Sequence, residues 1–337
     1  NEKFPKGMKY IADEIHAKGW LAGLWLAPFY IQKNSVVAKN HPEWIVKKPD
    51  GKPIYGFVGL GRDCYTLDFY NPECAAYIKQ FFNTILNTWG FDMVKLDFLY
   101  SQCIEPRDGK TRGEIMCDGV DFLREVCGDK WILGCGVPIG CCMGIFDACR
   151  ISCDASKNWK FKLEKGVAIN DLVASIRINC ENPSSQNAII NTVFRNHLDG
   201  RAFCNDPDVF FLRDININYT MEQKLLHGKI NSICGNVLFV SDNAGDFDDE
   251  RIGYLKEFFK DKDCSTFSGI EELTFLIEKL KSIPLLRVVR CSKDDTAVCA
   301  GKYHSHLCCR GRSKTSLHNI NTTSYQCTAN KLLNHLT

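Results

Sequence analysis

The sequence predicts an α/β fold, a (β/α)₈ barrel that is incomplete because its first strand is missing. Short apolar runs alternate with amphipathic helices along most of the 337 residues, as in parallel sheets built from βαβ units. We count seven strands, and a helix precedes the first. Aspartates follow several of the strands, and the carboxyl ends of barrel strands meet at one mouth. A doubly wound parallel sheet is the alternative architecture.

The first elements show clear local signals. A helix is expected over residues 4–18, where apolar residues recur on one face. The run WLAGLWLAP at residues 20–28 has the length of a buried parallel strand. The next helix begins at Asn71 and Pro72, because asparagine caps helices and proline suits the first helical position. Gly90 ends this helix.

The remaining elements follow in alternation. Helices are expected at residues 119–127, in parts of 160–198, at 221–233 and at 249–260. The seven predicted strands lie near residues 21–26, 63–68, 92–98, 131–135, 148–153, 201–205 and 235–241.

Three segments are expected. The barrel spans residues 1–260, and a helical extension follows over 261–284. Residues 285–337 form a tail rich in cysteine and histidine, with eight basic and two acidic side chains. Its hydrophobic periodicity is weak, so we predict an irregular C-terminal tail that is disordered or not the native continuation of the domain.

Composition excludes several functional classes. The net charge is +2, so no global field favours nucleic acid or an anionic membrane. No apolar run is long enough for a transmembrane helix. The chain begins NEKFPKGMKY, from which we expect no signal peptide. Most of the 19 cysteines are then expected to be reduced and buried in a cytoplasmic protein. A secreted disulfide protein is the alternative.

Lys95 and Asp97 form the first chemical pattern. They stand two residues apart on a predicted strand and therefore point to the same face. A neighbouring ammonium keeps a carboxylate ionised, which suits a nucleophile. The alternative is a buried ion pair that only fixes the strand.

Arg150 and Asp154 form the second pattern, four residues apart at the end of another strand. Covering Asp154 with substrate would raise its pKa and suit it to general acid catalysis. The alternative is a helix cap. Two carboxylates on neighbouring strand ends are what a glycosidase requires.

Longer segments resemble a known family. FPKGMKYIADEIHAKGWLAGLWLAPF, DMVKLDFLY, LGCGVP, ACRISCD followed by Trp159, and CNDPDVFFLRD resemble the α-galactosidases of glycoside hydrolase family 36. The relatives in family 27 share the NDPD element. The resemblance runs from about Phe4 to Asp242 and implies a retaining (β/α)₈-barrel enzyme of the melibiase type.

The resemblance also implies roles for single residues. Asp97 matches the nucleophile and Asp154 the general acid/base. The substrate-binding residues implied by matching motifs are Trp25, Arg62, Lys95, Cys135, Arg150 and Asp208. Arg62 rests on the weakest match. Trp25 offers an apolar face to a sugar ring, with simple barrel packing as the alternative.

The sequence departs from the family in three places. We find no N-terminal β-sandwich, no first strand with its acidic pair, and no recognisable C-terminal β-domain. The implied activity is hydrolysis of terminal α-galactose from oligosaccharides such as melibiose and raffinose, with no metal or organic cofactor. A raffinose-synthase-like transferase and a catalytically silent remnant are the alternatives. A homo-oligomer is left open, and the sequence does not distinguish galactose from N-acetylgalactosamine.

Overall fold

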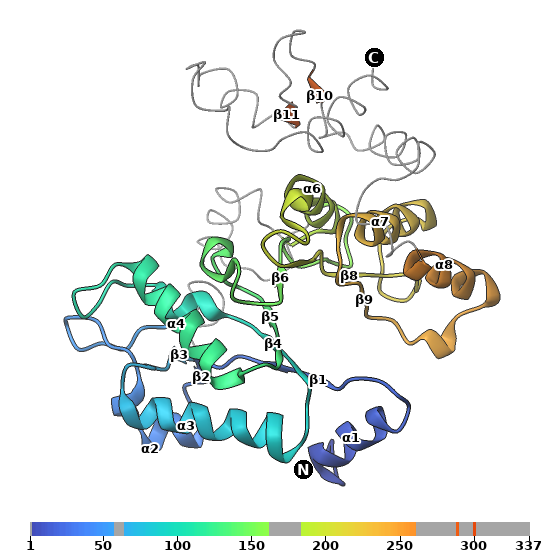
Figure 1. Ribbon diagram of the computed structural model, residues 1–337. Coiled ribbons are helices and arrows are strands. Elements are labelled where there is room, and N and C mark those ends of the chain that lie inside the picture. The colour runs from blue at the N-terminus through green and yellow to red at the C-terminus, as the bar shows by residue number, and fades with distance from the viewer. Residues whose placement is uncertain (1, 57–63, 162–182, 261–287, 290–298, 301–337) are drawn as a thin grey trace. The chain divides into compact units, whose positions relative to one another are not determined.

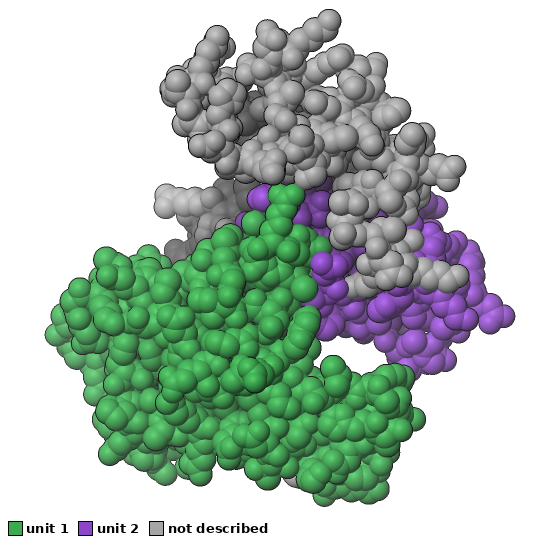
Figure 2. Space-filling view, viewed as in Figure 1, with its two compact units in different colours: residues 1–151, 163–180, 198–206 green, residues 152–162, 181–197, 207–337 purple. Residues whose placement is uncertain are grey.

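The chain divides into two compact units. A computed structural model describes residues 2–56, 64–161, 183–260, 288–289 and 299–300 (Figure 1). Unit 1 comprises residues 1–151, 163–180 and 198–206, and unit 2 comprises residues 152–162, 181–197 and 207–337 (Figure 2). Within the described residues, no helix is long and apolar enough to cross a membrane.

Unit 1 is built on a five-stranded parallel sheet with the strand order β1-β4-β5-β6-β7. All four pairings in this sheet are parallel, as the alternation in the sequence predicts. Among the described residues, β1 forms one edge of the sheet and β7 the other. The strands are β1 (Gly23–Leu26), β4 (Met93–Leu96), β5 (Trp131–Gly134), β6 (Ala148–Arg150) and β7 (Cys204–Asp206).

Helices of unit 1 cover the outer face of this sheet (Figure 1). Val94 and Leu96 of β4 and Ile132 of β5 are fully buried in one core with residues of these helices. Lys95 alternates with Val94 and Leu96 and therefore points to the opposite face. The helices are α1 (Gly7–His16), α2 (Val36–Asn40), α3 (Pro72–Asn83) and α4 (Arg112–Cys127).

Two helix starts have clear local causes. The Asn71 side chain accepts hydrogen bonds from the backbone N–H groups of Glu73 and Cys74 at 2.9 and 3.1 Å, so the predicted cap is confirmed. The helix α4 begins at Arg112, earlier than predicted. Thr111 and Glu114 form a capping box there, and this box fixes the start although the first turn is polar.

The predicted strand at residues 63–68 is wrong as a member of the parallel sheet. The structure has a shorter strand, β3 (Cys64–Thr66), which pairs antiparallel with β2 (Tyr30–Gln32). Both strands lie in the connection between β1 and α3. The composition of a short strand does not identify the strand with which it pairs. The alternation of strands and helices along the sequence therefore assigned this segment to the wrong sheet.

Unit 2 contains α6 (Ser185–Arg195), α7 (Met221–Cys234) and α8 (Asp249–Lys260). Its strands β8 (Val209–Phe210) and β9 (Phe239–Val240) pair in parallel. The helix α6 lies in the predicted helical region, much of which, residues 162–182, is outside the described residues. The proposed segments 261–284 and 285–337 are also outside them, except for the antiparallel strands β10 (Val288–Val289) and β11 (Cys299–Ala300).

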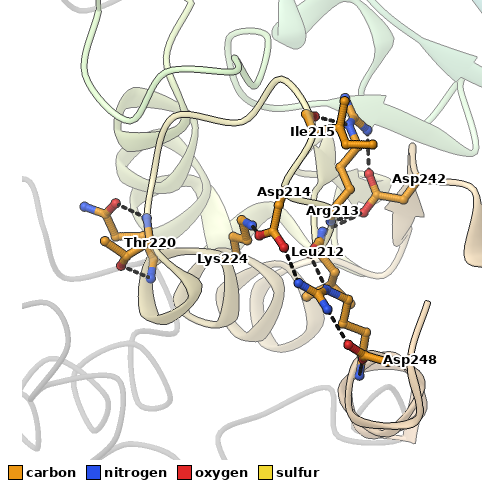
Figure 3. Close-up of polar contacts among 10 residues, drawn as sticks. Leu212, Arg213, Asp214, Ile215, Thr220, Lys224, Asp242 and Asp248 are labelled. Atoms are coloured by element: carbon orange, nitrogen blue, oxygen red, sulfur yellow. Dashed lines mark hydrogen bonds and ion pairs between the residues drawn. The ribbon is translucent and has the colours of Figure 1, made fainter. Parts of the chain in front are cut away.

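A polar network fixes the residues that follow β8 in unit 2 (Figure 3). The buried Asp242 carboxylate accepts hydrogen bonds from the backbone N–H groups of Leu212 and Arg213 and pairs with the Arg213 guanidinium. Asp214 pairs with the buried Lys224 of α7 and with Arg251 of α8. The network ties the end of β8 to both helices.

Candidate active site

A buried carboxylate with two cations lies on the inner face of the unit 1 sheet. Asp206 at the end of β7 is fully buried. One of its oxygens, Oδ2, lies 3.2 Å from Nζ of Lys95 and 3.5 Å from Nε of Arg150. The register explains the second contact, because Arg150 and Asp206 are partners across β6 and β7. The sequence placed Lys95 beside Asp97, and the structure adds Asp206 as a carboxylate that Lys95 contacts.

Asp97 lies immediately after β4 and is oriented by hydrogen bonds. Its own N–H donates to the carbonyl of Leu26 at 2.8 Å, which continues the pairing of β4 with β1. Its Oδ1 accepts from the backbone N–H of Phe98 at 2.7 Å, and its Oδ2 accepts from Nε1 of Trp25 at 3.1 Å. The carboxylate is half-buried. It is therefore fixed in direction and partly exposed.

The loop after β5 adds a thiol beside this carboxylate. Cys135 lies close enough to Asp97 for the carboxylate charge to act on its thiol. Burial raises the pKa of the Cys135 thiol to about 12, with the nearby Asp97 charge acting in the same direction and the Arg150 charge opposing it. The thiol is therefore protonated at neutral pH.

Gly136 allows the close approach of this loop to Asp97. Its φ is +53°, and a Cβ there would stand 3.0 Å from the backbone nitrogen of Phe98 and 3.1 Å from Oδ1 of Asp97. Phe98 itself has a φ of 55°, which is uncommon for a residue with a side chain. Gly136 and Phe98 thus both have a positive φ where their backbones approach the Asp97 carboxylate.

Three residues near the unit 1 carboxylates are not among the predicted site residues. Asp206 was recognised only as one of several strand-end acids, and Gly136 was not singled out. Tyr100 was also missed. Burial raises the pKa of the Tyr100 hydroxyl above its usual range, and the charges of Tyr30 and Asp97 add to this effect. For Gly136, the signal available in the sequence was its position directly after Cys135 at the end of a predicted strand.

The carboxylates of unit 2 are arranged differently. Asp154 is exposed in an irregular segment, and no helix begins in residues 155–161, so a helix cap is not its role there. Asp208 is buried, with a φ of 77°. Its Oδ2 accepts a hydrogen bond of 2.7 Å from the N–H of Ala155, next to Asp154. The side chain of Asn231 in α7 donates to the Asp208 carbonyl at 2.9 Å. Asp208 therefore holds the backbone beside Asp154.

The predicted site residues fall into three groups. Unit 1 brings together Trp25, Lys95, Asp97, Cys135 and Arg150 through the contacts described above, while unit 2 connects Asp208 to the segment of Asp154. Arg62 lies outside the described residues. In the described ranges, no group of three or more His, Cys, Asp or Glu side chains has the arrangement of a metal site.

The chain is similar to known α-galactosidases. Residues 1–113 match the Melibiase family model. The α-galactosidase Mel36A of Lactobacillus acidophilus is 31% identical over 96 residues, which are 28% of this chain and 12% of that protein. A blood-group A α-D-galactosamine galactosaminidase of Flavonifractor plautii is 33% identical over 114 residues, 31% of this chain and 11% of that one.

A solved structure extends the similarity to the fold. The α-galactosidase TtGalA of Thermus thermophilus, in complex with p-nitrophenyl α-D-galactopyranoside, aligns with a TM-score of 0.67 and 27% identity. The alignment covers 78% of this chain and 52% of that one, so the chain spans only part of each of these relatives. The chain is therefore similar to α-galactosidases in sequence and in fold, and its match to the Melibiase family model lies in residues 1–113.

Proposed function

We propose that this protein is a retaining glycoside hydrolase that removes terminal α-linked galactose from oligosaccharides such as melibiose and raffinose. The observation that carries the proposal is the Asp97 carboxylate, half-buried directly after β4 and oriented by hydrogen bonds from Trp25 and Phe98. The α-galactosidases that align with the chain support the choice of sugar. We also infer that the parallel sheet of unit 1 belongs to a (β/α)₈ barrel.

Asp97 is the nucleophile in this proposal. Its oxygen attacks the anomeric carbon, and a covalent galactosyl ester forms as the glycosidic bond breaks. Hydrogen bonds from Trp25 and Phe98 hold the carboxylate in the direction of attack. A positioned nucleophile reacts faster because the cost of ordering the reactants is already met in the folded protein.

Asp154 is the general acid and base. It protonates the leaving oxygen in the first step and deprotonates the attacking water in the second. Asp208 is a positioning residue in this scheme, because its carboxylate fixes the N–H of Ala155. The cations Lys95 and Arg150 and the half-exposed Trp25 ring contact the sugar.

The test is hydrolysis of p-nitrophenyl α-galactoside by the purified chain and by two variants. Asp97→Asn should abolish turnover, because it removes the nucleophile. Asp154→Ala should also be slow, but azide should accelerate it, since azide attacks the covalent intermediate without a general base. The first galactose released should be the α-anomer. Turnover unchanged in Asp97→Asn would sink the nucleophile assignment. Product analysis with sucrose present separates hydrolysis from transfer.

A further inference from the structure

Unit 1 contains a pair of thiols that the proposed reaction does not use. Cys142 ends the short 3₁₀ helix η4 (Ile139–Cys142), and Cys149 lies in β6. Their Sγ atoms are 3.5 Å apart. Both residues are fully buried in the core between the sheet and its helices. The two sulfurs are thus already in contact, with six residues between them in the sequence.

The two thiols have opposite tendencies to ionise. The two thiols share a hydrogen bond between their sulfurs, and this contact lowers the pKa of Cys142. The same contact, together with burial, raises the pKa of Cys149. The thiolate is the nucleophilic form of cysteine. The lower pKa makes Cys142 the sulfur that attacks an oxidant first, with the Cys149 thiol in contact with it.

A second pair of neighbouring thiols lies next to this pair. Burial raises the pKa of the Cys141 thiol to about 11, and the nearby Cys117 of α4 adds to this effect. Cys117 is exposed and Cys141 is half-buried. The pair Cys117 and Cys141 is more accessible to solvent. In the buried pair, Cys142 has the lowered pKa and ionises more readily. These differences make the two pairs distinguishable by experiment.

We propose that Cys142 and Cys149 form a redox modification site, which hydrogen peroxide converts into an intramolecular disulfide. The Cys142 thiolate attacks one peroxide oxygen, hydroxide leaves, and a sulfenic acid forms. The Cys149 thiol then attacks the Cys142 sulfur, the S–O bond breaks, and water leaves with the thiol proton. In total, two thiols and one peroxide give one disulfide and two waters. Hydrogen peroxide suits the site because it is small and uncharged, and the pair is buried.

The disulfide would link η4 covalently to β6. The residue after Cys149 is Arg150, whose guanidinium faces the buried Asp206. The Cα of Cys149 also pairs with Asn205 of β7 and with Gly134 of β5. Oxidation therefore acts on the strand that carries one of the two cations of the proposed site, from the face opposite to it.

The test maps the cysteine linkage after peroxide treatment. The full chain is exposed to hydrogen peroxide, remaining thiols are alkylated, and the protein is digested without reduction. Trypsin alone leaves both cysteines in the peptide 131–150. An additional cleavage before Asp147 separates residues 131–146 from 147–150. The proposal predicts that these two fragments stay linked, about 2 Da lighter than the sum of the reduced fragments. A dithiol should release them.

Single variants identify the partner of Cys149, since residues 131–146 also contain Cys135 and Cys141. Cys142→Ser should abolish the link, whereas the neighbouring control Cys141→Ser should retain it. If Cys142→Ser fails to fold, fragmentation of the linked wild-type peptides assigns the sulfur instead. A link confined to Cys117 and Cys141, a link from Cys135 to Cys149, or sulfinic acid without any link would each overturn the proposal.

Discussion

The indole Nε1 of Trp25 in β1 donates a hydrogen bond of 3.1 Å to Oδ2 of Asp97, the proposed nucleophile. Trp25 is 53% exposed, so it is not a core residue. The indole N–H therefore has a polar role as a donor to Asp97. This role is separate from that of the ring face, which can pack against a sugar. The indole N–H orients one carboxylate oxygen while the backbone N–H of Phe98 holds the other.

Replacing Trp25 by phenylalanine should therefore slow catalysis with little effect on folding. The variant retains a ring but lacks the N–H donor. A hydrogen bond to a charged group contributes about 1.5–3 kcal/mol, so we expect kcat for an aryl α-galactoside to fall roughly tenfold to a hundredfold. Trp20→Phe is the matched control, because Trp20 is 65% exposed and outside the site. Equal rates for the two variants would contradict the orienting role.

Asp206 should be far more important for stability than Asp154. Asp206→Asn leaves Lys95 and Arg150 without their shared buried carboxylate. Breaking a buried ion pair costs about 3–5 kcal/mol, which urea denaturation would detect. Asp154→Asn alters an exposed side chain and should change the free energy of unfolding by less than about 0.5 kcal/mol. Similar losses for both variants would refute this distinction.

Gly136 should tolerate no side chain. Gly136→Ala would place a Cβ 3.0 Å from the nitrogen of Phe98 at a φ of +53°, and the left-handed conformation alone costs about 1–2 kcal/mol. We expect lower stability and, since Asp97 must move, lower kcat. Gly140→Ala is the control, because a Cβ there meets no atom within 4 Å. Thermal unfolding and kcat measured on both variants check the prediction, which fails if the two behave alike.

His227 of α7 should make unfolding depend on pH. Its side chain is fully buried, both ring nitrogens have no hydrogen-bond partner, and burial lowers its pKa from 6.5 to about 4. The unfolded chain therefore binds the additional proton between these values. The contribution of the neutral His227 ring to the free energy of unfolding is complete above pH 6.5. It is lost as the pH falls toward 4, by about 3 kcal/mol in total.

Urea denaturation at pH 7.5 and pH 5 isolates this effect. Over that interval the wild type should lose about 2 kcal/mol more stability than His227→Leu, which has no group to titrate. The comparison cancels the contribution of the carboxylates that both proteins share. Parallel pH dependences would show that His227 is not buried as a neutral ring.

Local signals in the sequence predicted the features that depend on neighbours in the chain. The cap at Asn71 and the face of Lys95 follow from spacing over a few residues, and both agree with the structure. The segment at residues 63–68 was misassigned because its partner, Tyr30–Gln32, lies more than 30 residues earlier. Strand pairing at that distance depends on tertiary packing and not on the composition of the strand.

The contacts among the predicted site residues follow from the sequence less completely than their places on the strands. The motifs identified Lys95, Asp97 and Arg150, and the parallel register then aligns Arg150 with Asp206. No spacing rule relates Lys95 to a carboxylate 111 residues later in the chain. The indole donor to Asp97 comes from β1, and the thiol near Asp97 comes from the loop after β5, so only the assembled sheet shows them. The roles of Asp97, Asp154 and Asp208 stay predictions.

The central claim is that Asp97 forms a covalent bond to galactose, and chemical trapping tests it most directly. An α-galactosyl fluoride with a second fluorine at C5 should form the galactosyl ester and release it slowly. Digestion with trypsin gives the peptide 96–107, which contains Asp97 and Glu105, and fragmentation distinguishes them. We predict one galactosyl group on Asp97 and none on the Asp97→Asn variant. A label on another carboxylate, or none on a chain that hydrolyses α-galactosides, would contradict the account.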